Sequence, residues 1–170
     1  KRGVATISSG NHGSSVSYAA SLLGIQAVRV IVPESTPRSK VERIRYFGAE
    51  VLQMGRDYDE AHALGMAYIQ SGGMTYIDPY YDDPLIYAGQ GTVAVEILHQ
   101  NPNIDTIVVP VGGGGLLTGI AVAAKALKPT IRVVGVQTEA CPALIQSYKD
   151  GVFYAEYPSR PSLCDSLIGG

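Results

Sequence analysis

The alternation of two kinds of segment is the feature of this chain that most restricts its fold. Short runs rich in β-branched residues predict strands, and the longer amphipathic runs between them predict helices. The expected strands are 4–7, 28–32, 51–53, 106–109 and 131–136, and the expected helices are 14–23, 39–47, 57–70, 84–100, 116–127 and 142–149. Repeated strand–helix–strand units build parallel sheets through right-handed crossovers. The sequence therefore predicts an α/β protein with open parallel sheets and flanking helices.

Helix ends are marked along the chain by glycine and by capping residues. Gly24, Gly48 and Gly72 each follow an apolar-periodic stretch, where a helix commonly ends on a left-handed residue. Asp57 and Glu60 have the spacing of a capping box, in which side chains accept the free N–H groups of a first helical turn. These signals support the predicted helix boundaries.

A segment dense in Tyr, Asp and Pro, residues 76–83, separates two α/β groups. It predicts a small α/β domain at residues 1–83 and a second α/β unit at residues 84–170. The chain opens directly into its first strand and stops without a closing element, so we expect it to be a fragment of a longer protein.

Composition and charge exclude several classes of protein. The chain has 170 residues, of which 46% are hydrophobic, and this is enough to bury a core. A net charge of −2 gives no broad positive field for nucleic acid or anionic membrane, so a small-molecule partner is favoured. Two cysteines cannot form a disulfide framework, and no apolar run approaches the roughly 18 residues of a membrane span. We expect a soluble cytoplasmic protein.

The segment from Ser8 to Gly13 follows a predicted strand and precedes a predicted helix. In open α/β sheets, ligands collect at the carboxyl ends of strands, and the N-terminus of the next helix offers free N–H groups and a positive dipole. The pattern favours an anionic ligand. The alternative is an ordinary turn in which Ser and Asn cap the helix.

Four consecutive glycines, Gly112 to Gly115, lie between another predicted strand and helix. Glycines cost backbone entropy on folding, so four of them indicate that backbone N–H groups must pack closely around a ligand, most simply a phosphate. The alternative is a flexible or tightly packed turn.

Other phosphate and ester motifs do not fit this sequence. A G-x-G-x-x-G frame that starts on Gly112 or Gly113 ends on Leu117 or Thr118, so the dinucleotide fingerprint fails. A Gly-Lys pair and a G-x-S-x-G elbow are both absent from the sequence. Nucleotide and ester chemistry are therefore disfavoured.

The three histidines match no zinc-ligand pattern. His62 and His99 fall in predicted helices and are expected on the surface or in packing, whereas His12 lies in the first candidate loop. Cys141 precedes a helix start without a partner base, so a packing role is expected. We predict no metal site.

Taken together, the two loops resemble the paired signature of the fold-type-II pyridoxal-phosphate enzymes. Four segments in order are similar to threonine dehydratases and serine racemases: Val4–Leu23, Gly48–Val51, Ala88–Thr92 and Pro110–Leu116. This resemblance covers nearly the whole chain. It implies that residues 84–170 are the first half of a large domain that binds pyridoxal phosphate.

The resemblance also assigns roles to the first loop. It implies that Asn11 hydrogen-bonds the pyridoxal hydroxyl, and that Ser8, Ser9, Gly10 and His12 hold the carboxylate of an amino-acid substrate. Ser9 matches the serine that acts as the second acid/base in racemising relatives, and in a dehydratase the same position only binds.

The resemblance also assigns a role to the second loop, which is to bind the cofactor phosphate. The resemblance implies that Gly112, Gly113, Gly114 and Gly115, with the N–H of Leu116, hold that phosphate. The physical argument from four glycines pointed independently to the same ligand.

In such enzymes a lysine forms a Schiff base with the cofactor and removes the substrate α-proton. The family's lysine lies upstream of the first loop, and Lys1 does not match it, so we expect the isolated chain to be inactive. Gln137 and Ala143 replace carboxylates of the metal-activated racemases, which argues against a metal site of that type.

The favoured hypothesis is a region of a pyridoxal-phosphate-dependent threonine/serine ammonia-lyase, whose parent protein is expected to be a homo-oligomer. A serine racemase or a threonine synthase of the same fold is the nearest alternative. A non-catalytic module that binds the cofactor or an amino acid is a second class. A nicotinamide-dependent oxidoreductase rests only on the α/β pattern and the glycines.

Overall fold

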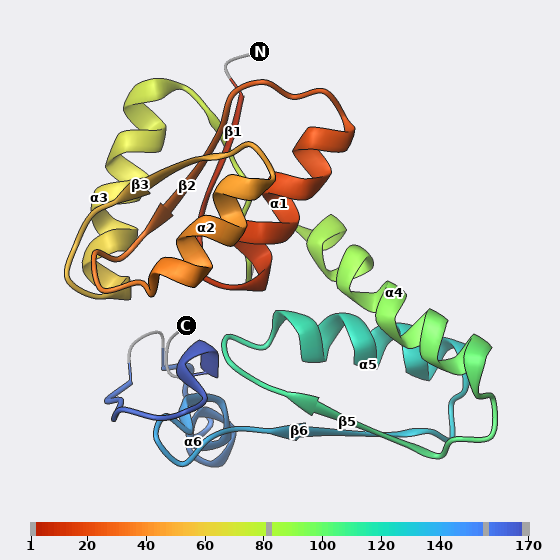
Figure 1. The fold of residues 1–170 in the computed structure, drawn as a ribbon. Coiled ribbons are helices and arrows are strands. Elements are labelled where there is room, and N and C mark those ends of the chain that lie inside the picture. The colour runs from red at the N-terminus through yellow and green to blue at the C-terminus, as the bar shows by residue number, and fades with distance from the viewer. Residues whose placement is uncertain (1–2, 81–82, 155–156, 168–170) are drawn as a thin grey trace. The chain divides into compact units, whose positions relative to one another are not determined.

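A computed structural model describes residues 3–80, 83–154 and 157–167 of the chain. The chain forms two compact units, Lys1–Pro79 and Tyr80–Gly170 (Figure 1). Each unit combines parallel strands with flanking helices, so the predicted α/β class is confirmed. Lys1, to which the sequence comparison assigned no role, lies outside the described residues.

The sheet of the first unit has four parallel strands in the order β3-β2-β1-β4. The strands are β1 (Val4–Ile7), β2 (Val28–Val32), β3 (Glu50–Gln53) and β4 (Thr75–Tyr76). Strand β4 was not predicted, because it has two residues and lies at the start of a segment whose composition is typical of a loop. It is held at the sheet edge by pairing with β1, where Val4 faces Thr75.

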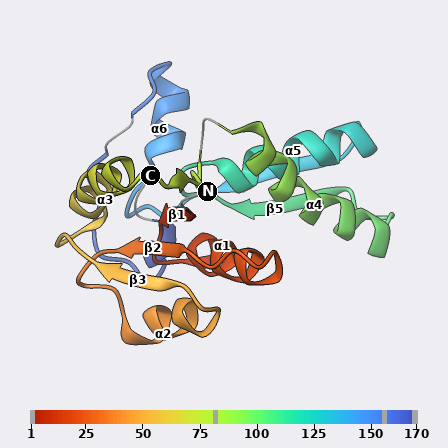
Figure 2. The same cartoon turned by 90° about the horizontal axis from the view of Figure 1, so that it is seen from above.

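Helices cover both faces of this sheet, with α1 (Asn11–Leu22) and α2 (Arg38–Tyr46) on one face and α3 (Tyr58–Gly72) on the other (Figures 1 and 2). The alternation of side chains along β2 explains the two cores. Val28, Val30 and Val32 pack with residues of α1 and α2, whereas Ile31 packs with Ile69 of α3. A sheet buried on both faces requires such continuous apolar strands.

Helix ends follow the predicted signals with one exception. Gly24 and Gly48 have positive φ angles of 67° and 87°, as predicted. Gly72 belongs to α3, and its neighbour Gly73 (φ 62°) caps that helix, so the prediction for Gly72 was wrong by one residue. The reason is local: Met74 N–H donates to the Ile69 carbonyl, and this closing bond sets the left-handed residue at position 73.

The predicted cap of α3 is present. The Glu60 N–H donates to Asp57 Oδ1 at 3.0 Å. The Glu60 carboxylate accepts hydrogen bonds from the backbone N–H and Nε of Arg56, which completes the cap one residue earlier than the usual box.

The second unit has a two-stranded parallel sheet of β5 (Thr106–Pro110) and β6 (Arg132–Val136). Its helices are α4 (Pro84–Gln100), α5 (Gly115–Leu127) and α6 (Ala143–Asp150), and a short 3₁₀ helix spans Asp165–Leu167. Helices α4 and α5 pack closely at Gly119, which has no side chain. A Cβ there would lie 2.5 Å from the Tyr87 carbonyl oxygen. Their contact adds Ala94, Ile120 and Ala124 to the core.

The described part of the chain contains no helix with the length and apolar character that membrane crossing requires. Cys141 is buried and Cys164 is exposed, and neither forms a disulfide.

Replacement of Ile31 tests the core beneath α3. Ile31 is fully buried, so Ile31→Ala should lower the free energy of unfolding by about 2–5 kcal/mol, because a cavity remains where the side chain was removed. Urea unfolding, monitored by circular dichroism, measures this change in the free energy of unfolding. Leu22→Ala, at a side chain that is 69% exposed, is the control and should change stability by less than about 0.5 kcal/mol. Equal effects of the two substitutions would contradict the described packing.

Candidate functional site

The first loop, residues 8–10, continues the carboxyl end of β1 and leads directly into α1. The Ser8 N–H donates to the Ile31 carbonyl at 3.0 Å, so the loop extends the pairing of β1 with β2. The Gly10 N–H donates to Ser8 Oγ at 3.3 Å. Ser8 and Ser9 are half-buried at the position where open α/β sheets bind ligands.

Helix α1 begins at Asn11, three residues earlier than the sequence predicted. The Ser14 N–H and hydroxyl both donate to the Gly10 carbonyl, which closes the first turn around residues 11–13. A Cβ on Gly13 would lie 2.3 Å from the Ser8 carbonyl oxygen, so only glycine allows this turn to approach the loop. The earlier start places Asn11 and His12 in the first turn of the helix.

Among the described residues, no side chain caps α1, whose N-cap is Gly10. This contradicts the alternative in which Ser and Asn cap the helix. The N-termini of α3 and α4 differ, because Asp57 and Asp83 accept from their first-turn N–H groups. The first turn of α1 also lacks acidic residues. Its free N–H groups and the helix dipole therefore remain available to an anion.

His12 is held by the segment that follows β4. Its Nε2 lies 3.2 Å from the Ile77 carbonyl oxygen, which also accepts from Thr6 Oγ1 at 2.8 Å. A carbonyl only accepts hydrogen bonds, so Nε2 carries the proton and Nδ1 of the neutral ring keeps a lone pair. Burial lowers the pKa of His12, and this effect outweighs the Ile77 hydrogen bond and the charge of Asp78, which raise it. The ring is therefore neutral at pH 7.

The second loop, Gly112–Gly115, follows β5 in the same way that the first loop follows β1. The Val111 N–H donates to the Val136 carbonyl at 2.9 Å, so pairing with β6 continues to the edge of the loop. Gly114 is the N-cap of α5 and has a φ of 92°, a left-handed conformation that side chains disfavour. As in α1, the described residues supply neither a side-chain cap nor an acidic residue in the first turn.

Two side chains of the second unit pack against the glycines. A Cβ on Gly113 would lie 2.6 Å from a ring carbon of Tyr80, and a Cβ on Gly114 would lie 3.0 Å from Leu144 Cδ1. Sequence reasoning missed both neighbours, because neither Tyr80 nor Leu144 belongs to a recognisable motif. The loop is a tightly packed turn whose backbone also presents the N–H groups of a helix N-terminus.

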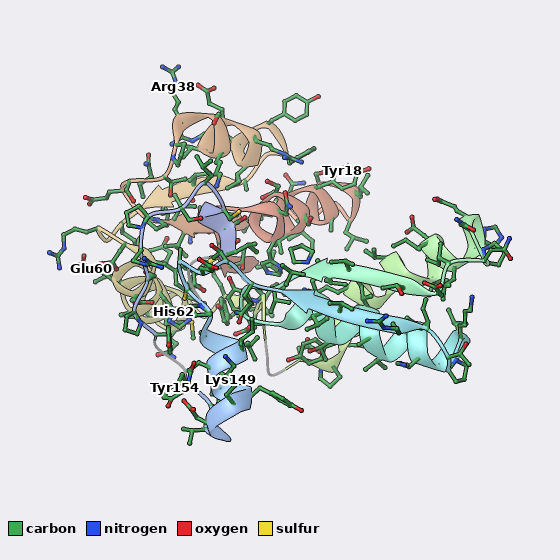
Figure 3. The ribbon with its side chains drawn as sticks, turned by 90° about the horizontal axis from the view of Figure 1, so that it is seen from below. Tyr18, Arg38, Glu60, His62, Lys149 and Tyr154 are labelled. Carbon is green, nitrogen blue, oxygen red and sulfur yellow. The ribbon has the colours of Figure 1, made fainter. Side chains whose placement is uncertain are left out.

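The remaining histidines and cysteines lie apart from these loops in sequence. His62 projects from α3, where its ring lies 6.0 Å from that of Tyr58 (Figure 3). His99 lies in the last turn of α4, and Cys141 is buried just before α6. In the ranges that the structure describes, no group of three or more His, Cys, Asp or Glu residues could hold a metal ion.

Two lysines of the second unit lie at the far end of α5. Lys125 is ten residues beyond Gly115, which corresponds to about 15 Å along a helix. Lys128 Nζ donates to the carbonyls of Pro102 and Ile104. A third, Lys149, lies in the last turn of α6 (Figure 3). Lys125 and Lys128 thus donate to backbone carbonyls outside the glycine loop, and Lys149 lies at the C-terminal end of its helix.

The whole chain, residues 1–170, matches the family described as "Pyridoxal-phosphate dependent enzyme". The chain belongs to this family. Pyridoxal phosphate is thus the cofactor of the family to which this chain belongs.

Curated members of the pyridoxal-phosphate dependent enzyme family are similar to the chain over most of its length. It is 42% identical over 166 residues to an L-threonine ammonia-lyase of Geobacter sulfurreducens, covering 98% of this chain and 40% of that protein. It is 46% identical over 149 residues to a biosynthetic L-threonine dehydratase of Pasteurella multocida, covering 88% of this chain and 29% of that protein. The chain therefore spans less than half the length of these relatives.

Solved structures show the same fold. Maize serine racemase superposes with a TM-score of 0.87 at 35% identity, over 99% of this chain and 50% of the racemase chain. The processed form of threonine deaminase isoform 2 from Solanum lycopersicum superposes with a TM-score of 0.88 at 31% identity, over 99% of this chain and 48% of the deaminase chain. The chain has the fold of about half of each of these enzymes.

The depressed pKa of His12 predicts a pH dependence of stability. The unfolded state takes up a proton near the ordinary pKa of 6.5, whereas the folded state does so only at lower pH. Stability associated with neutral His12 is therefore present above pH 6.5 and is lost as the pH falls towards the folded pKa. His12→Gln should reduce the loss of unfolding free energy between about pH 7 and pH 5.

Urea unfolding at the two pH values measures this difference. His99→Gln, which removes a histidine from an exposed helix end, is the matched control. An equal loss of stability in the wild type and in His12→Gln would contradict the assignment of a buried neutral ring.

Proposed function

We propose that this chain is the cofactor-binding region of a threonine/serine ammonia-lyase, which converts a β-hydroxy amino acid into a 2-oxo acid and ammonia. The relatives named L-threonine ammonia-lyase and L-threonine dehydratase support this substrate class. The structural observation that carries the proposal is a pair of helix N-termini, α1 after β1 and α5 after β5. Each has a glycine as its N-cap and, among the described residues, no side-chain hydrogen bond that caps it. In this assignment residues 1–83 form a small domain, and residues 84–170 form the first half of a large one.

The second loop fits the phosphate of pyridoxal phosphate. The N–H groups of residues 112–115 and of Leu116 belong to the loop and to the first turn of α5, where the helix dipole favours an anion. Gly112, Gly113 and Gly114 are half-buried and have no side chains of their own, so part of their backbone is exposed. The first turn holds no carboxylate that would repel a phosphate. We assign the phosphate to these five residues.

The first loop fits an amino-acid carboxylate and the cofactor ring. Asn11 is exposed in the first turn of α1, so its amide is accessible to the pyridoxal hydroxyl. Ser8 and Ser9 offer hydroxyl donors, whereas the N–H groups of Ser8 and Gly10 already donate to the Ile31 carbonyl and to Ser8 Oγ. The α1 dipole adds a favourable field for a carboxylate. The neutral His12 ring offers only the lone pair of Nδ1, which cannot bind a carboxylate, so His12 would contribute its backbone N–H.

When bound, pyridoxal phosphate withdraws electrons from the α-carbon of an amino acid, which makes loss of the α-proton feasible. The residues of this chain then bind the cofactor and orient the amino acid. The first loop holds the carboxylate, and the second anchors the phosphate. Ser9 presents a hydroxyl that only binds in a lyase, whereas in a racemase it would exchange a proton with the α-carbon.

A serine racemase is the second candidate, because maize serine racemase superposes with a TM-score of 0.87. A threonine synthase of the same fold and a non-catalytic binding module are the remaining alternatives. Products distinguish these possibilities: a lyase releases 2-oxo acid and ammonia, a racemase inverts serine, and a binding module shows no turnover.

The first test uses the complete natural protein. We expect pyridoxal phosphate to give a visible absorption band that borohydride reduction fixes to a lysine, and L-threonine or L-serine to yield equal amounts of 2-oxo acid and ammonia. Peptide mass mapping locates the labelled lysine. Inversion of serine without ammonia would favour the racemase, and binding without turnover would favour the module.

Replacement of Asn11 tests the ring contact. Asn11→Ala should lower kcat/KM by about tenfold or more, since loss of a hydrogen bond to a reacting system weakens transition-state stabilisation. The absorption band of the bound cofactor should shift as well. Asn103→Ala, at an exposed turn, is the matched control and should leave both unchanged. Identical kinetics and spectra for Asn11→Ala and wild type would remove Asn11 from the site.

A further inference from the structure

Gly113 needs to be glycine for a reason other than backbone conformation. Positive φ angles occur at Gly114 and at several other glycines, but Gly113 is not among them. What excludes a side chain there is the aromatic ring of Tyr80, with three ring carbons at 2.6–3.0 Å from the position of a Cβ. The ring of Tyr80 therefore lies directly against the loop backbone.

Tyr80 is itself fixed to helix α4. The hydroxyl of Tyr87 donates a hydrogen bond to the carbonyl of Tyr80. Tyr87 lies in the first turn of α4, and its own carbonyl approaches Gly119 of α5 at the close contact of the two helices. The chain of contacts thus leads from the α4–α5 packing through Tyr87 and Tyr80 to Gly113.

Leu144 of α6 contacts the next residue of the loop, because a Cβ on Gly114 would lie 3.0 Å from its Cδ1. The loop backbone is consequently supported by an aromatic ring at one glycine and by an aliphatic side chain at the next. A run of four glycines has high conformational freedom in isolation, and these contacts restrict it. The loop N–H groups are then held in place before any anion binds.

We infer that Tyr80 is a positioning residue of the phosphate loop, whose ring holds Gly113 so that the N–H groups at the start of α5 converge on a phosphate. This inference rests on the proposed function. Tyr80 acts through the loop backbone rather than by touching the cofactor. Its contribution is therefore specific to the phosphate group of the ligand.

Comparison of two ligands tests this specificity. Pyridoxal phosphate and pyridoxal share the ring and differ in the phosphate. In the complete natural protein, Tyr80→Ala should weaken binding of pyridoxal phosphate by roughly tenfold, since small misplacements of a preorganised site have effects of this size. Binding of pyridoxal should change by less than about twofold, and Tyr80→Phe, which keeps the ring, should restore the phosphate preference.

A double substitution tests the contact itself. Gly113→Ala should weaken phosphate binding because the new methyl group meets the ring, and adding Tyr80→Ala should cost less than the sum of the two single losses, since the clash is then gone. Tyr148→Ala, at a tyrosine that is 91% exposed on α6, is the matched control and should bind as the wild type does. Thermal unfolding checks each variant, and Tyr80→Leu replaces Tyr80→Ala if the latter does not fold.

The outcomes test the phosphate role of the loop and the positioning role of Tyr80 separately. A wild type that binds pyridoxal phosphate no better than pyridoxal would overturn the phosphate role of the loop and the inference with it. A clear phosphate preference that Tyr80→Ala and Tyr80→Leu leave intact would overturn the inference alone. Equal losses for both ligands, or additive losses in the double variant, would also reject Tyr80 as a positioning residue.

Discussion

The proposed site depends on backbone N–H groups at the start of two helices that no side chain of the described residues caps. Helices α1 and α5 each follow the carboxyl end of a parallel strand, and each has a glycine N-cap without a side-chain hydrogen bond. Helices α3 and α4 have aspartate caps. Free N–H groups and the helix dipole make such ends favourable for anions. A phosphate would suit the N-terminus of α5, and a carboxylate would suit that of α1.

Much of this arrangement could be predicted from the sequence because it follows from local rules. The strands β1 and β2 appeared with their predicted bounds, since short runs dominated by β-branched residues strongly favour strands. The residues of both loops were identified from their position between a strand and a helix. The start of α1 was placed too late, at Ser14, because the hydrogen bonds of Ser14 back to Gly10 have no sequence signature.

The remaining features depend on contacts between residues distant in sequence. Strand β4 exists only because β1 offers a free edge, and its two residues carry no periodic signal. His12 is held by the Ile77 carbonyl, 65 residues away. Tyr80 lies against Gly113, and no motif joins them. Such contacts decide which ring nitrogen of the histidine carries the proton and how the glycine loop is packed, which the residue types alone leave open.

The most direct test of the account is a nuclear magnetic resonance titration of the complete natural protein, labelled with ¹⁵N only at glycine. The labels report the loops themselves and also glycines elsewhere, such as Gly24, Gly48 and Gly151 at helix C-termini. We predict that pyridoxal phosphate shifts the amide resonances of Gly112–Gly115 and of Gly10 and Gly13. The resonances of the three glycines at helix C-termini should not move. Unchanged loop resonances at a ligand concentration that saturates the cofactor absorption band would contradict the account.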